Sequence, residues 1–79
     1  MTTKQPIPLC TLKSDHTGII HSLLAGQALT SRLATLGFTP GTELVMLQNY
    51  GWGPVIVQVR DARIALGRGE ARKIHVTAQ

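Results

Sequence analysis

The chain has 79 residues, of which 43% are hydrophobic and 15% are charged, and its net charge is +4 at pH 7. This length predicts a single domain with a thin core, and the hydrophobic content excludes a disordered chain. No apolar run reaches the roughly 20 residues of a membrane-spanning helix, and residues 1–7 lack the apolar stretch of a secretion signal. We therefore expect a cytoplasmic protein that does not insert into a membrane.

The first part of the chain is expected to form strands after a short irregular segment. Residues 1–8 contain two prolines and predict a loosely ordered lead-in to a single domain over residues 9–79. The apolar positions within 7–12 are expected in or near the first strand. Residues 17–26, which are rich in β-branched and aliphatic side chains and follow a polar loop, predict a strand.

A change of apolar period marks the one expected helix. Leucines at i, i+4 and i+7 predict a short amphipathic helix over residues 27–36. Gly37 follows directly, and as a left-handed residue it would end the helix in a Schellman motif with Leu33 against Phe38. Leu36 is expected to help these two side chains attach the helix to the core.

The remainder of the chain alternates between turns and short strands. Pro40 and Gly41 occupy the second and third positions of an expected type II turn. A tight reversal is expected at Asp61 and Ala62, with at most one helical turn before the last strand. The expected strands cover 43–49, 55–60, 63–66 and 74–76. The pattern predicts a mainly β fold, a small barrel of about five short strands with one short helix inserted after the first strand.

Several stretches resemble the FeoA family, small SH3-like barrels of bacterial ferrous iron uptake. They are "RLATLGFTPGTEL", the pair Gly53 and Pro54 that opens the next strand, and the ending "IALGRGEARKIHV". The similarity extends from about Leu9 to Val76. It implies an SH3-like barrel and a cytosolic accessory protein that binds an FeoB-type membrane permease, which has a GTP-binding domain, and modulates its transport or GTPase function. The protein would lie at the inner membrane only through that partner.

Neither catalysis nor a bound cofactor is expected from the residues. Cys10 has no sequence-evident base beside it, and the glycine clusters lack the length and the Lys of a phosphate-binding loop. The candidate metal ligands are Cys10, Asp15, His16, His21 and His75. They form neither an i, i+4 helical pair nor a CxxC motif, so we expect no physiological metal site, although zinc could bridge molecules through exposed histidines. A weak homo-oligomer is compatible with the sequence.

The stretch "NYGWGP" is the main candidate for protein binding. Tyr50 and Trp52 are rigid aromatic anchors of the kind favoured at interfaces, and the glycines around them can present both rings. Folding of Trp52 back over one end of the barrel is an equally good interpretation. Basic side chains could complement an acidic partner. The candidates are Arg32 on the helix and Arg60, Arg63, Arg68 and Arg72 in the last third of the chain.

Binding of RNA or another nucleic acid is the alternative function. It requires a basic groove with stacking aromatic residues, and here the aromatic residues are few. Arginines at alternating strand positions are also typical of a solvated face. The protein-binding interpretation is therefore favoured.

Overall fold

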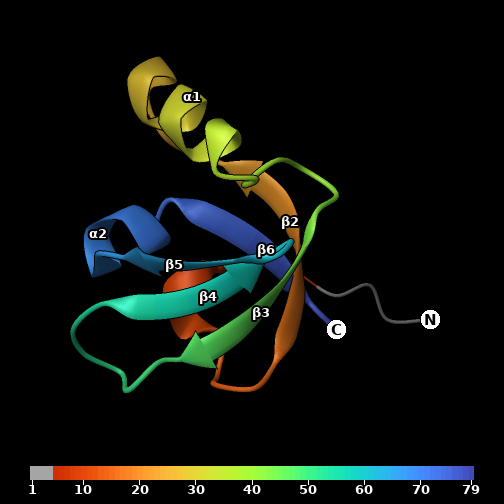
Figure 1. Cartoon of the computed structure of the whole chain (residues 1–79), viewed down its shortest axis with the longest axis vertical. Coiled ribbons are helices and arrows are strands. Elements are labelled where there is room, and N and C mark those ends of the chain that lie inside the picture. Colours follow the sequence, from red (N-terminus) through yellow and green to blue (C-terminus); the bar gives the residue numbers. More distant parts are fainter. Residues whose placement is uncertain (1–4) are drawn as a thin grey trace.

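The computed structural model describes residues 5–79, which form one antiparallel sheet of six strands with two α-helices and a 3-10 helix (Figure 1). The strands are β1 (Ile7–Pro8), β2 (Thr17–Leu23), β3 (Glu43–Gln48), β4 (Val55–Val59), β5 (Ala62–Leu66) and β6 (Ile74–Ala78). The helices are η1 (Leu9–Thr11), α1 (Gln27–Thr35) and α2 (Arg68–Ala71). None of the helices in this part of the chain has both the length and the apolar content needed to cross a membrane.

The sheet curls around one aliphatic core. Its strand order is β1-β6-β2-β3-β4-β5, and β2 pairs with both β3 and β6. Alternate residues of β4 point inward, which is the period of two expected for a half-buried strand. The buried residues are Leu9, Leu12, Ile20, Leu33, Phe38, Leu44, Met46, Val55, Val57, Val59, Leu66, Ala71, Ile74 and Val76. Helices and strands from the whole described chain therefore share a single core.

The predicted mainly β fold class is confirmed, and the structure adds one strand to the expected five. The expected first strand is shortened to β1, because Pro6 and Pro8 have no N–H to continue a ladder. The chain then turns through η1, and α1 consequently follows the second strand instead of the first. Residues 1–4 of the expected lead-in lie outside the described residues, and its last two residues form β1.

The predicted Schellman motif at the end of α1 is confirmed. Gly37 has a φ of +104°, the N–H of Phe38 donates to the carbonyl of Leu33 (3.0 Å), and the N–H of Gly37 donates to the carbonyl of Ala34 (3.0 Å). Leu33 and Phe38 are fully buried. Leu36 differs from the expectation because it is 43% exposed: the reversal at Gly37 directs Phe38 into the core in its place.

The predicted type II turn follows directly and is bonded to β2. Gly41 has a φ of +90°, and the N–H of Thr42 donates to the carbonyl of Thr39 (3.1 Å). The N–H of Gly41 donates to the carbonyl of Ile20 (2.8 Å), whose own N–H donates to the carbonyl of Thr42 (2.9 Å). These bonds fix the start of β3 beside the middle of β2.

The reversal between β4 and β5 lies one residue earlier than predicted. Val59 pairs with Ala62, so the turn consists of Arg60 and Asp61 and not of Asp61 and Ala62. Arg60 has a φ of +58°, a left-handed backbone conformation that residues other than Gly, Asn and Asp seldom adopt. The apolar periodicity of β4 places Val59 inside the ladder, and the turn residues follow from that register.

Alanine substitutions at Gly37 and Gly41 distinguish the cost of a positive φ from the cost of a steric clash. A Cβ atom at Gly37 would lie 2.9 Å from Cγ1 of Val59, whereas a Cβ at Gly41 meets nothing within 4 Å. We expect Gly41→Ala to lower the free energy of unfolding by about 1 kcal/mol through its positive φ. Gly37→Ala should lower it by about 1 to 3 kcal/mol more, because Val59 must move. Urea denaturation of both variants checks this, and equal losses would contradict the clash.

Candidate functional site

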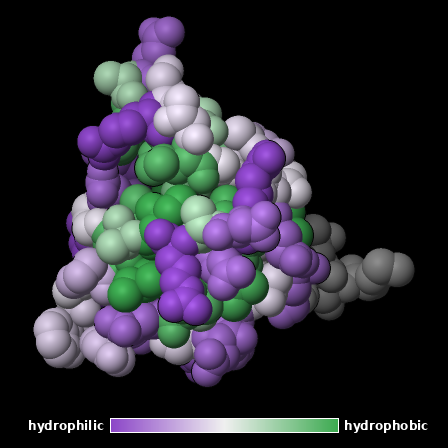
Figure 2. Space-filling model, in the orientation of Figure 1, coloured by the Kyte–Doolittle hydropathy of each residue, from purple (hydrophilic) through white to green (hydrophobic). Residues whose placement is uncertain are grey.

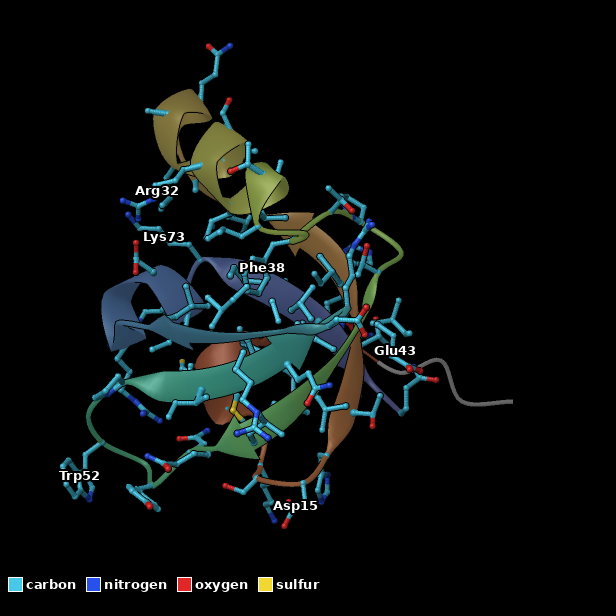
Figure 3. All side chains as sticks on the ribbon, viewed as in Figure 1. Asp15, Arg32, Phe38, Glu43, Trp52 and Lys73 are labelled. Carbon is cyan, nitrogen blue, oxygen red and sulfur yellow. The ribbon has the colours of Figure 1, made fainter. Side chains whose placement is uncertain are left out.

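The loop between β3 and β4 presents two aromatic rings to solvent. Tyr50 is 64% exposed and Trp52 is 72% exposed, and their ring centroids lie 6.0 Å apart with planes tilted by 39°. Figure 3 shows Trp52 at the tip of this loop, directed away from the barrel. Trp52 therefore does not cover an end of the barrel, and the loop presents both rings to solvent, while protein binding by them stays a prediction.

Asn49 holds the base of the aromatic loop. Its Nδ2 donates to the carbonyls of Cys10 (2.9 Å) and Leu12 (2.8 Å), and its Oδ1 accepts from the N–H of Gly51 (3.0 Å). Its backbone N–H donates to Oγ of Ser14 (2.9 Å). One side chain thus joins the loop to η1 and to the segment after it. Asn49 was not among the residues predicted from the sequence to form a site.

Arg68 braces the same loop from α2. Its Nη1 donates to the carbonyl of Gly53 (3.0 Å), and its Nη2 donates to the carbonyl of Cys10 (3.0 Å) and to Oδ1 of Asn49 (2.9 Å). Arg68 is half-buried and its guanidinium is bonded within the protein, whereas its place on a partner-facing basic surface stays a prediction. Its position directly after β5 and Gly67 turns the side chain inward across the loop, where the carbonyl groups require donors.

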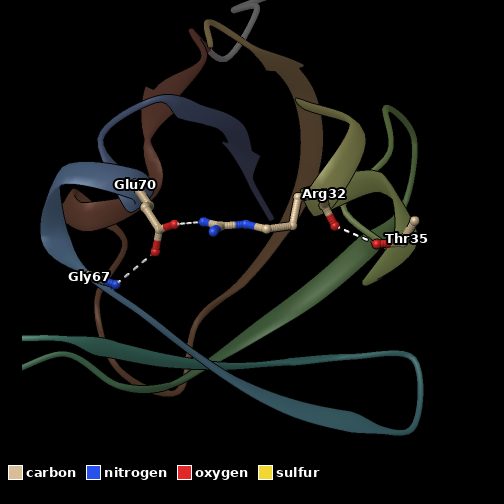
Figure 4. A network of polar contacts seen from close by, with 4 residues as sticks. All are labelled: Arg32, Thr35, Gly67 and Glu70. Atoms are coloured by element: carbon tan, nitrogen blue, oxygen red, sulfur yellow. Dashed lines mark hydrogen bonds and ion pairs between the residues drawn. The ribbon is translucent and has the colours of Figure 1, made fainter. Parts of the chain in front are cut away.

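A second polar contact joins the two α-helices (Figure 4). Arg32 on α1 forms an ion pair with Glu70 on α2, and the Arg32 side chain is 63% exposed. Oε1 of Glu70 also accepts from the N–H of Gly67 at the start of α2 (3.4 Å). The hydroxyl of Thr35 donates to the carbonyl of Arg32 (2.6 Å). Arg32 thus has an ion-pair partner within the protein although most of its side chain is exposed, and its role in partner binding stays a prediction.

The predicted site residues do not form one surface. Figure 3 places Arg32 between α1 and α2 and Trp52 well below it, at the tip of the loop. Arg60, Arg63 and Arg72 are exposed, in the turn before β5, on β5 and at the end of α2. The aromatic pair is the part of the predicted site that the structure presents as a unit.

The candidate metal ligands are dispersed. Within residues 5–79, no three His, Cys, Asp or Glu side chains are placed to hold a metal ion. Asp15, His16 and His21 are exposed, and Cys10 is a half-buried free cysteine. His75 is also half-buried, and its Nδ1 has no hydrogen-bond partner among the described residues.

Comparisons of the sequence with known proteins identify one family. Residues 7–78 match a family model described as the FeoA domain. A protein of Methanocaldococcus jannaschii named "Putative Fe(2+) transport protein A" is 36% identical over 69 residues, which are 87% of this chain and 83% of that protein.

Two solved structures of FeoA proteins have the same fold. The crystal structure of an iron uptake regulatory protein, FeoA, is 29% identical, with a TM-score of 0.88 and coverage of 95% of this chain and 100% of that chain. Stenotrophomonas maltophilia FeoA complexed with zinc, described as a prokaryotic SH3 domain protein, is 31% identical, with a TM-score of 0.77 and coverage of 91% and 88%. The SH3-like fold expected from the sequence is confirmed.

Replacement of Asn49 tests the bracing of the aromatic loop. Asn49→Ala removes the side-chain donor to the carbonyl of Leu12, one of two donors to the carbonyl of Cys10 and one acceptor of Arg68, and we expect a loss of about 2 to 3 kcal/mol in the free energy of unfolding. The neighbouring Gln48→Ala is the control and should cost less than about 1 kcal/mol. Thermal and urea unfolding check both variants. Equal stabilities would contradict a bracing role for Asn49.

A double-mutant cycle tests the contact between the α-helices. Because Arg32 is largely exposed, Arg32→Ala should lower the free energy of unfolding by less than about 1 kcal/mol. Glu70→Gln keeps the acceptor for Gly67 and removes the charge, so Arg32→Ala in that background should cost almost nothing further. An unchanged cost in the Glu70→Gln background would show that the ion pair does not stabilise the fold.

Proposed function

This chain belongs to the FeoA family, and we propose that it acts on the cytoplasmic side of the membrane by binding the cytosolic part of an FeoB-type iron permease. Binding would modulate the transport or the GTPase function of that permease. Family membership supports the assignment to ferrous iron transport, and the description of the Stenotrophomonas relative raises the role of a transport activating factor.

The main support for this proposal is the exposure of Tyr50 and Trp52. A protein of this size gains stability from each large apolar side chain that it buries, yet Tyr50 and Trp52 are left in water. Large aromatic side chains of this kind are the residues that most often dominate binding energy at protein interfaces. Their exposure is therefore better explained by a partner than by the fold.

The bracing of the loop adds to this argument. A partner that binds a flexible loop must order it, and the entropy lost on ordering weakens binding. Here Asn49 and Arg68 already hold the loop on both sides of its tip, so less ordering remains. The loop is pre-organised for binding.

The exposed basic residues act at longer range. Arg60, Arg63, Arg72 and Lys73 are exposed and give the chain much of its positive charge. Such charges speed the encounter with an acidic surface more than they strengthen the final complex. We expect association with the permease to slow as the salt concentration rises.

Affinity capture from membranes that contain the permease tests the proposal. We expect Trp52→Ala to reduce the permease recovered with the tagged protein at least about tenfold, which is the loss typical of an aromatic anchor. Leu24→Ala is the matched control because Leu24 is also a large exposed side chain (65%) but precedes α1. Mass spectrometry identifies the recovered permease, and thermal unfolding shows that both variants remain folded.

The possible results distinguish an error in the proposed partner, the permease, from an error in the proposed contact surface, the aromatic loop. If the unaltered protein recovers no iron permease, the proposed partner is wrong. If it does, and Trp52→Ala recovers as much permease as the control, the aromatic loop is not the contact. A loss confined to Leu24→Ala would place the contact near α1 instead.

A further inference from the structure

The outer edge of β5 is open to another strand. Within residues 5–79, β5 stands at one end of the strand order and pairs with β4 alone. The opposite end is β1, which has two residues and includes Pro8, so it offers little backbone for pairing. β5 has five residues and no proline. The sheet thus has one edge that is suited to a further strand.

The register of the hairpin decides which backbone groups of β5 face outward. Val59 and Ala62 flank a two-residue turn, and residues in that position form a hydrogen-bonded pair. Pairs with and without hydrogen bonds then alternate, so Arg63 and Ala65 direct their N–H and C=O groups away from β4. No turn, loop or cap hydrogen bond within residues 5–79 engages these groups.

The side chains on this edge leave room for a partner. Arg63 and Ala65 are exposed, whereas Ile64 is half-buried and Leu66 is buried against the core. Figure 2 shows the face on which β5 lies, where hydrophilic side chains surround and partly cover an apolar area. A strand laid beside β5 would therefore meet unpaired backbone groups without displacing the core.

The positive charge near β5 favours an acidic partner strand over a basic one. The segment 60–73 carries five Lys and Arg against two Asp and Glu. Of these, Arg68 is bonded to the aromatic loop and Glu70 is paired with Arg32, which leaves four basic side chains and one acidic side chain. A second copy of the chain would bring two such segments together, and like charges across a strand pair are destabilising. A strand that carries carboxylates would instead be attracted to Arg60 and Arg63.

We propose that β5 accepts an extended, acidic segment of a partner protein as an additional strand. The outward N–H and C=O groups of Arg63 and Ala65 bond to the backbone of that segment, and the arginines in the turn and on β5 contact its carboxylates. In this mode of recognition the backbone bonds supply affinity and the side chains supply specificity. The proposal uses a surface other than the Tyr50 and Trp52 loop, so it can fail while the proposed function holds, and the reverse.

A model peptide tests the proposal directly. The probe is a capped peptide of about eight residues with alternating Glu and Val, and a Lys and Val peptide of the same length is its charge-reversed control. NMR follows amide hydrogen exchange. Without peptide, the amides of Arg63 and Ala65 should exchange faster than that of Ile64. Saturating acidic peptide should slow both at least about tenfold, and the basic peptide should not.

Two substitutions separate backbone pairing from charge. Ala65→Pro removes one outward N–H but leaves the ladder to β4 intact, and it should abolish the protection of Arg63 by the acidic peptide. Arg63→Glu keeps the backbone and should weaken peptide binding at least about tenfold. If Ala65→Pro does not fold, Arg63→Glu still decides the question.

Three results would overturn the proposal. The first is an absence of slowed exchange at Arg63 and Ala65 with the acidic peptide. The second is equal slowing by the basic peptide, or binding at Tyr50 and Trp52 in place of β5. The third is protection of Arg63 and Ala65 that rises with protein concentration when no peptide is present, since that would identify a second copy of the chain as the occupant.

Discussion

The reversal at Gly37 is the constraint on which the arrangement of the barrel depends. It ends α1 and brings Phe38 into the core beside Leu33. The type II turn that follows bonds to Ile20, so the same short segment also aligns β3 with β2. Because a chain of this length has few large side chains to bury, a joint that places one of them and sets a strand register has a large effect on the whole fold.

Where the chemistry is local, the sequence was sufficient to predict the structure. The end of α1, the turn at Pro40 and Gly41, and the strand character of β4 follow from residues that lie next to one another. The predictions of strand and turn boundaries were wrong where the pairing of strands, or a proline within a strand, decides where an element ends. Pro8 stops β1 early, and the register of β4 moves the hairpin turn to Arg60 and Asp61.

The candidate site was predicted only in part, for a physical reason. The residue types at Tyr50 and Trp52 make this loop a candidate for protein binding, but their exposure depends on the direction in which the loop is held. That direction is set by Asn49 and Arg68, which lie 19 residues apart in the sequence, so no local pattern predicts their contact. Arginines that look equivalent in the sequence consequently have different surroundings: Arg68 bonds to loop carbonyls, Arg32 is paired with Glu70, and Arg63 lies on β5 at the end of the strand order of residues 5–79.

The contact from Arg68 to the carbonyl of Cys10 also bears on the order in which the protein is completed. These residues stand near opposite ends of the chain, and contacts of such long sequence separation form late in folding. During synthesis the aromatic loop leaves the ribosome before α2 exists, and it gains the contacts of Arg68 only when the last part of the chain has folded. Before α2 forms, Asn49 can already join the loop to residues 10–14, and Arg68 adds the contacts that tie the loop to the last part of the chain.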